Sequence, residues 1–264
     1  MTPTLFVNPR SGGGKATAAG LLERARERGI DVVVVEPGQR LASLVEDAVA
    51  RGADALGIAG GDGSLAVVAA AALAHGLPFV CVPAGTRNHF ALDLGIARDD
   101  PIGALDAFEN RVERFVDVAD VNGRLFLNNV SIGVYGEAVR RRDYRSAKAR
   151  TLLETVLGPS ESADGVEIVD GRGRRHHEPA VVLVSNNPYS LEPPRPPGTR
   201  AALDRGELGI VVLDPPSPAR AWTAPSVEVS ASAPVHAGID GEAVTLDPPL
   251  RFAIRPRALR VLVP

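Results

Sequence analysis

Residues 60–64 (GGDGS) place one carboxylate among three glycines, directly after the apolar run Ala55–Ala59. Glycine tolerates a positive φ and lets a ligand approach the backbone closely. An alanine-rich segment of helical composition follows, and the first turn of a helix offers amide groups and a positive dipole end to an anion. A carboxylate would repel a bare phosphate, so Asp62 indicates a metal ion that bridges it to a polyphosphate. The alternative is an aspartate that only caps the helix. We favour nucleotide chemistry.

Two more loops have the same position after an apolar run. Residues 8–15 (NPRSGGGK) lack the spacing of a Walker A loop, and they either cradle phosphates through their amides and Lys15 or form a flexible turn. In residues 83–90 (PAGTRNHF), Thr86 and Asn88 either contact phosphate or ribose or form local Asx-type hydrogen bonds. Because parallel strands end at one edge of their sheet, we expect the three loops to converge there.

The first hundred residues alternate strand-like and helix-like segments. Continuous apolar runs such as Asp31–Val35 are typical of parallel strands covered on both faces. Gly29 follows one helical segment as a C′ residue, and Gly52 follows another. The expected strands are Thr4–Val7, Asp31–Val35, Ala55–Ala59 and Pro78–Val82, and the expected helices are Ala16–Arg28, Leu41–Arg51 and Ser64–His75. This rhythm predicts a doubly wound parallel sheet, with ligands at the carboxyl ends of its strands.

After about residue 111 short strand-like runs dominate, punctuated by proline and glycine, and one helical candidate, Glu137–Val156, interrupts them. Such a pattern is typical of an antiparallel sandwich. The runs are Arg124–Val130, Val166–Val169, Ala180–Ser185, Leu208–Leu213, Val227–Ser230, Val235–Ile239, Leu250–Ile254 and Leu259–Val263. We therefore predict two domains: an α/β domain at 1–115 and a β-rich domain at 116–264.

A pair of carboxylates flanks a glycine at Asp240-Gly241-Glu242, near the end of the chain. Asp-Gly alone is usually a hairpin turn. Two acids at this spacing could instead place one near a substrate hydroxyl and the other near a metal.

Taken together and in this order, these motifs resemble the diacylglycerol kinase catalytic-domain family, which includes bacterial diacylglycerol and related lipid kinases and the sphingosine kinases. The residues that carry the resemblance are Asn8-Pro9-x-Ser11-Gly12, residues 60–64, residues 83–88, Asp240-Gly241-Glu242 and residues 258–264 (ALRVLVP). The resemblance covers essentially the whole chain.

The resemblance implies an ATP-binding α/β domain, a β-rich domain and catalysis in the cleft between them. It places Asp62 near Mg²⁺, Asp240 as the base, and Glu242 as a metal or orienting group, with these two roles open to exchange. It also implies contacts to ATP from Asn8, Pro9, Arg10, Ser11, Gly12, Gly61, Asp62, Gly63, Ser64, Leu65, Ala66, Val67, Thr86 and Asn88.

Three positions depart from the family pattern. Ser64 replaces a threonine but keeps the hydroxyl. His89 stands where many members have an aspartate. In the segment Leu203–Leu208, Arg205 takes the place of an acid in a loop that often holds a structural magnesium beside a residue such as Asp204, so that second metal is in doubt.

The composition of the chain limits the partners and the location that we expect for the protein. The net charge of −3 argues against nucleic acid, and the single cysteine, Cys81, lies in an apolar run that indicates a buried structural thiol. No apolar run reaches the roughly twenty residues of a membrane span, and the first ten residues lack the layout of a signal peptide, so we expect a cytoplasmic protein. The basic segment Arg140–Arg150 either docks on anionic lipid at the inner membrane face or forms a solvated helix face. Arg172–His177 is expected to form an exposed hairpin tip. A homodimer is compatible with these features.

The leading hypothesis is an ATP- and Mg²⁺-dependent kinase that phosphorylates the hydroxyl of diacylglycerol or a related lipid at the membrane surface. One alternative is an NAD kinase-like enzyme, which shares a Gly-Gly-Asp-Gly loop. The other is a nucleotide- or lipid-binding protein without catalysis, which His89 and Arg205 suggest.

Overall fold

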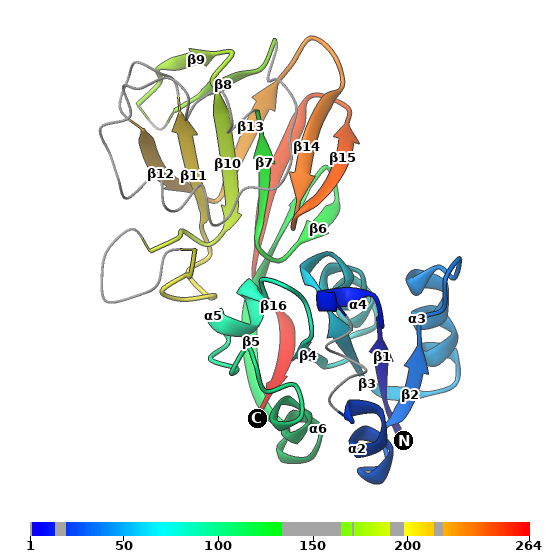
Figure 1. Cartoon of the computed structure of the whole chain (residues 1–264). Coiled ribbons are helices and arrows are strands. Elements are labelled where there is room, and N and C mark those ends of the chain that lie inside the picture. Colours follow the sequence, from blue (N-terminus) through cyan, green and yellow to red (C-terminus); the bar gives the residue numbers. More distant parts are fainter. Residues whose placement is uncertain (1, 14–19, 134–164, 171, 191–197, 214–218) are drawn as a thin grey trace. The chain divides into compact units, whose positions relative to one another are not determined.

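The computed structural model describes residues 2–13, 20–133, 165–170, 172–190, 198–213 and 219–264 (Figure 1). The chain forms two compact units. Unit 1 contains Met1–Val116 and Arg257–Pro264, and unit 2 contains Asp117–Pro256. Within the described residues, no helix is long and apolar enough to cross a membrane. The helix expected at Glu137–Val156 and the basic segment Arg140–Arg150 lie outside the described residues.

Unit 1 is built on parallel strands in the order β2-β1-β3-β4, with helices between them in sequence (Figure 1). The strands are β1 (Thr2–Val7), β2 (Asp31–Val34), β3 (Ala53–Gly60) and β4 (Phe79–Pro83). The helices are α2 (Leu21–Glu27), α3 (Leu41–Ala50), α4 (Asp62–His75), α5 (His89–Asp93) and α6 (Asp106–Asn110), with 3-10 turns at Ser11–Gly13 and Gly103–Leu105. The doubly wound α/β fold predicted for this part is confirmed.

Burial explains why these strands read as continuous apolar runs. The whole of β4 is buried, and so are the last six residues of β3, because side chains on both faces of the strands are covered. The alanines of α4 allow the helix to pack closely, with Leu65, Val68 and Ala69 in the core. Gly29, at φ 72°, follows α2 in the left-handed conformation expected of a residue that ends a helix.

Unit 2 is an antiparallel β structure, as the sequence predicted. One sheet has the order β12-β11-β10-β7-β14-β15, and the other contains β16-β13-β8-β9 with β5 and β6. Side chains from both sheets share one buried core, which makes a sandwich. The strands not yet given are β6 (Arg124–Phe126), β7 (Asn129–Ile132), β8 (Glu167–Val169), β9 (Arg175–His177), β10 (Val181–Asn186), β11 (Leu208–Leu213), β12 (Arg220–Ala224), β13 (Ser226–Ser230), β14 (Val235–Ile239) and β15 (Glu242–Leu246).

Two long strands, β5 (Val112–Val121) and β16 (Leu250–Val263), have residues in both units. The boundary at 115 falls inside β5, and residues 257–264 belong to unit 1 instead of the β-rich unit. The physical reason is strand pairing: β16 pairs antiparallel with β13 and then parallel with β4. The two apolar runs at its ends were expected to be separate strands, but Arg257, at φ 50°, continues one into the other.

The β8–β9 hairpin confirms an exposed turn at residues 172–174, but residues 175–177 form β9 and His176 is buried, so the exposed tip is shorter than predicted. A buried aspartate organises this turn. Asp170 accepts hydrogen bonds from the amides of Arg172 and Arg174 at 2.9 and 3.0 Å, and it lies 3.3 Å from the buried ring of His176. Arg220 of β12 approaches the same carboxylate at 3.7 Å. Burial raises the pKa of Asp170, but these amides, His176 and Arg220 together lower it from its usual 3.8 to about 2.

This shift predicts a pH dependence of stability. A carboxyl group whose pKa is lower in the folded than in the unfolded chain stabilises the fold above its unfolded pKa, and the contribution is lost as the pH falls through the folded value. We expect the difference in unfolding free energy between the wild type and Asp170→Asn to be full above about pH 4 and to shrink between pH 4 and 2. Urea unfolding at several pH values measures it, with Asp247→Asn, an exposed position, as the control. A constant difference from pH 7 to pH 2 would contradict the assignment.

Candidate active site

The three predicted loops come together at the carboxyl ends of β1, β3 and β4, which are neighbours in the sheet. Asn8 Nδ2 donates to Ser64 Oγ at 3.2 Å, and the Gly61 amide donates to Ser11 Oγ at 3.3 Å. The first loop thus holds the start of α4 through two side chains that the sequence had selected. The expected convergence of the loops is confirmed.

Glycine is required where the loops approach one another. A Cβ on Gly12, which has φ 58°, would lie 2.4 Å from the carbonyl oxygen of Ala84. A Cβ on Gly85 would lie 2.6 Å from the Cα of Gly61. Real Cβ atoms do not tolerate such contacts with backbone, so any side chain here would push the loops apart. The spacing between the three loops therefore depends on these glycines.

Asn88 shapes the third loop. Its Oδ1 accepts a hydrogen bond from the Gly85 amide at 2.8 Å, and its Nδ2 donates to the Gly85 carbonyl at 3.0 Å. The residue is 3% exposed and adopts φ 53°, a conformation that asparagine tolerates better than most residues. The side chain is used within the loop, which favours the Asx-type alternative over a contact to ribose or phosphate. Thr86, two residues earlier, is exposed.

Asp62 is the first residue of α4, and Gly61 is its N-cap. The first intrahelical bond of α4 reaches the amide of Leu65, so the amides of Gly63 and Ser64 belong to the first turn, which has no intrahelical acceptors. Burial raises the pKa of the Cys81 thiol well above its usual 9.0, and the charge of Asp62 raises it further. Cys81 is 1% exposed, so the buried structural thiol is confirmed.

The remaining residues predicted to contact ATP differ in exposure. Pro9 and Ala66 are half-buried, and Arg10 and Val67 are exposed. Leu65 is 2% exposed and packs in the core of unit 1. Its amide already donates to the carbonyl of Gly61 at 3.1 Å, so neither its buried side chain nor its amide is available to a ligand.

In unit 2, Asp240 and Gly241 form the two-residue turn between β14 and β15. Ile239 pairs with Glu242, and both turn residues have positive φ, 48° and 87°, as a type I′ turn requires. The carboxylate of Asp240 is 6% exposed and accepts three backbone hydrogen bonds, from the amides of Leu127, Asn128 and Asn129 at 2.8, 2.8 and 3.1 Å. Its oxygens are committed to the fold. Glu242, in contrast, is exposed.

Arg200, which is 1% exposed, donates hydrogen bonds to acceptors in the same segment, Leu127–Asn129. Its guanidinium donates to the carbonyl of Leu127 at 2.6 Å, to the carbonyl of Asn186 at 2.8 Å and to Oδ1 of Asn128 at 2.8 Å. Asn186 also donates to the carbonyls of Asp117 and Leu127. Sequence reasoning missed Arg200 and Asn186. The repeated Asn-Asn pairs at 128–129 and 186–187, each at the end of an apolar run, were the available signal.

The loop at 204–206, where the resemblance implied a second metal, is held by protein groups. The Arg205 amide donates to Asn187 Oδ1 at 2.9 Å, and the Gly206 amide donates to Asp117 Oδ2 at 2.6 Å. In the part of the chain that the structure describes, no three acidic, histidine or cysteine side chains gather as a metal site.

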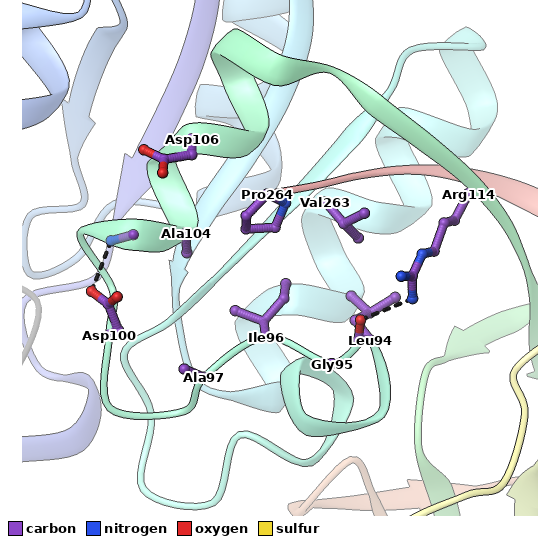
Figure 2. A pocket seen from close by; sticks show the side chains of 11 residues that line it. Leu94, Gly95, Ile96, Ala97, Asp100, Ala104, Asp106, Arg114, Val263 and Pro264 are labelled. Atoms are coloured by element: carbon purple, nitrogen blue, oxygen red, sulfur yellow. Dashed lines mark hydrogen bonds between the residues drawn. The ribbon is translucent and has the colours of Figure 1, made fainter.

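Unit 1 also contains a hollow of about 310 Å³ (Figure 2). It is lined by Leu94, Gly95, Ile96, Ala97, Asp100, Gly103, Ala104, Asp106, Arg114, Val263 and Pro264. Two of its polar side chains are engaged locally, since Arg114 donates to the carbonyl of Leu94 at 3.1 Å and Asp100 accepts from the Gly103 amide at 2.8 Å. None of the three loops contributes to this lining, so we do not assign it to the active site.

The chain thus combines a parallel α/β unit, whose three loops pack together through glycines, with an antiparallel β unit. Comparison with known proteins places this combination in one family. The model of the diacylglycerol kinase catalytic domain matches residues 2–121. A Pseudomonas fluorescens protein named "Probable lipid kinase YegS-like" is 30% identical over 84% of this chain and 81% of its own length. A Pseudomonas aeruginosa protein of the same name is 29% identical over 95% and 89%. The chain therefore belongs to the diacylglycerol kinase catalytic-domain family of lipid kinases.

Two further comparisons have narrower scope. A diacylglycerol kinase of Mycobacterium tuberculosis is 33% identical over 46% of this chain, and the match spans only 41% of that protein. The crystal structure of a Bacillus anthracis diacylglycerol kinase matches the whole chain and 97% of its own, with a TM-score of 0.71 at 19% identity. This second likeness supports the fold.

Because Asp240 is buried and Glu242 is exposed, we expect their substitution to lower the unfolding free energy by different amounts. Asp240→Ala leaves three buried amides without an acceptor, which should lower the unfolding free energy by about 3 kcal/mol or more. Glu242→Gln, at an exposed position, should change it by less than about 0.5 kcal/mol. Denaturant unfolding of both variants measures the contrast. Equal losses in the two variants would contradict the structural role of Asp240.

Proposed function

We propose that this protein transfers the γ-phosphoryl group of ATP, with Mg²⁺, to the hydroxyl of diacylglycerol or a related membrane lipid. The observation that carries the proposal is the set of three loops packed at the ends of β1, β3 and β4, in a chain whose relatives are named as lipid kinases. The substrate lies in a membrane. The basic segment expected to reach it, Arg140–Arg150, lies outside the described residues.

The loop residues fit a nucleotide with its metal. The amides of Gly63 and Ser64 lie in the first turn of a fourteen-residue helix, where anions bind favourably. In the first loop, a Cβ on Gly13 would meet nothing within 4 Å, so a ligand can approach the backbone there. Mg²⁺ usually takes one or two carboxylates together with substrate phosphates, so Asp62 would suffice as the protein ligand without a dedicated cluster. When bound, the metal neutralises charge on the transferring phosphoryl group. Leu65 and Asn88 support the loops in this proposal, and Thr86 offers its hydroxyl.

We assign the role of general base to Glu242 instead of Asp240. The carboxylate of Asp240 accepts three buried amides, and withdrawing it to take a proton would leave them unsatisfied. Glu242 follows the same rigid turn and is exposed. It would accept the proton of the lipid hydroxyl while that oxygen forms a bond to the γ-phosphorus and the bond to ADP breaks. In this proposal Asp240 sets the geometry of the turn, and Glu242 acts as the base and not as a metal ligand.

The reaction is tested with labelled ATP and extracted lipids. The wild type should label lipid in a Mg²⁺-dependent reaction, and Glu242→Gln should lower kcat by about 10²–10⁴, because a positioned base contributes that much. Glu228→Gln, an exposed glutamate of the same unit, is the control and should keep full activity. Transfer to NAD instead of lipid would favour the NAD kinase-like alternative, and ATP binding without any transfer would favour the non-catalytic one.

Nucleotide binding has a readout that does not require turnover. Cys81 is the only cysteine, and it is buried in β4, the strand that leads into the third loop. A ligand that binds only the folded form at one hundred times its Kd stabilises it by about 2.7 kcal/mol. ATP with Mg²⁺ should therefore slow alkylation of Cys81 by up to about 100-fold, and the effect should weaken in Asp62→Asn. Labelling at the same rate with and without nucleotide would contradict the assignment of the loops.

A further inference from the structure

An open groove lies in unit 2 where edges of its two sheets approach. β9 ends one sheet and β12 ends the other, and both are visible at the margin of this unit (Figure 1). The groove has a volume of about 590 Å³. It is lined by Asp170 and Arg172 from the β8–β9 turn and by Ala219, Arg220, Ala221, Trp222 and Thr223 along β12. None of the candidate active-site residues lines it.

The groove is basic, and its single carboxylate is already compensated. Asp170 is engaged by two backbone amides, His176 and Arg220. The side chains of Arg172 and Arg174 are exposed and form no ion pair within the described part of the chain. Nε of Arg220 is buried and finds no acceptor among the described residues. Arg172 and Arg220 thus line the groove beside one compensated acid, with Arg174 exposed on the same turn. Guanidinium is the side chain best suited to phosphate oxygens.

Apolar side chains accompany these charges. Trp222 is half-buried, packs against the sandwich core and lines the groove. Val169, 44% exposed, pairs across the hairpin with Arg175, whose charge is taken up by Glu167. Tryptophan is favoured at membrane interfaces because one end of its ring is apolar and the other donates a hydrogen bond. A groove with two arginines and a tryptophan, next to an exposed valine on the adjoining hairpin, suits a lipid surface better than a free ion in water.

We propose that this groove docks the protein on anionic phospholipid bilayers, with a headgroup phosphate held between Arg172 and Arg220 and with Trp222 at the interface. The surface is distinct from the basic segment at 140–150 and does not depend on the kinase reaction. Each basic residue near an anionic membrane surface contributes about a factor of five to binding, so a few arginines suffice for reversible docking.

Trp222 is the only tryptophan of the chain, so its fluorescence reports the groove directly. The wild type should sediment with vesicles containing phosphatidylglycerol, and its emission should change on binding, while pure phosphatidylcholine vesicles should cause neither effect. The double variant Arg172→Gln/Arg174→Gln should lower the partition coefficient about tenfold or more. Arg124→Gln is the matched control, since Arg124 is exposed beside the turn of the β5–β6 hairpin of the same unit.

Four outcomes would overturn the proposal. They are an absence of sedimentation with anionic vesicles, sedimentation without a change in Trp222 emission, equal binding by the double variant and the control, and the same emission change with inorganic phosphate at equal phosphate concentration. A thermal midpoint of the double variant close to that of the wild type shows that its loss of binding is not unfolding. Phosphorylation of a short-chain lipid in neutral detergent is measured separately, so a failed docking test and a failed kinase assay are distinguishable.

Discussion

Unit 2 depends on one buried backbone segment, Leu127–Asn129, whose polar groups must find partners away from water. The carboxylate of Asp240 accepts all three of its amides, and the guanidinium of Arg200 binds the carbonyl of Leu127 and the side chain of Asn128. Two opposite charges are thus compensated through the same short segment. Neither charge can move without leaving a buried group unsatisfied, which fixes the β14–β15 turn and with it the starting point of Glu242.

In unit 1, by contrast, backbone amides near the candidate site have no helical acceptor. The loops after β1, β3 and β4 pack against one another through glycines, and side-chain bonds such as Asn8 to Ser64 hold them together. The first turn of α4 keeps amides that no helical carbonyl accepts. One unit uses its buried amides to fix a carboxylate, and the other presents amides where a phosphate would bind. In the proposed reaction, this separates binding of the phosphates from acceptance of the proton.

Most of the fold could be predicted because it depends on local sequence patterns. Continuous apolar runs gave the parallel strands, and Gly29 ended its helix as expected. Four strands were missed. Three of them, β9, β12 and β15, are edge strands rich in polar or exposed residues, so their apolar pattern is weak. The fourth, β5, pairs with β16 and β6, but its first four residues are exposed. The assignment of residues 257–264 to unit 1 was not predicted, because it follows from the pairing of β16 with strands of both units. Pairing between distant segments leaves no mark in the composition of either strand.

The sequence by itself determined that three glycine loops follow parallel strands and that an Asp-Gly turn carries two acids. Tertiary structure alone decided which polar side chains are already in use. Asp240 meets its three donors more than a hundred residues away, and Arg200 meets the carbonyl of Leu127 across 73 residues. The sequence alone does not distinguish a carboxylate that faces solvent from one that accepts three amides. Its chemistry is set by the hydrogen bonds that folding brings to it, and these come from segments that no local pattern connects.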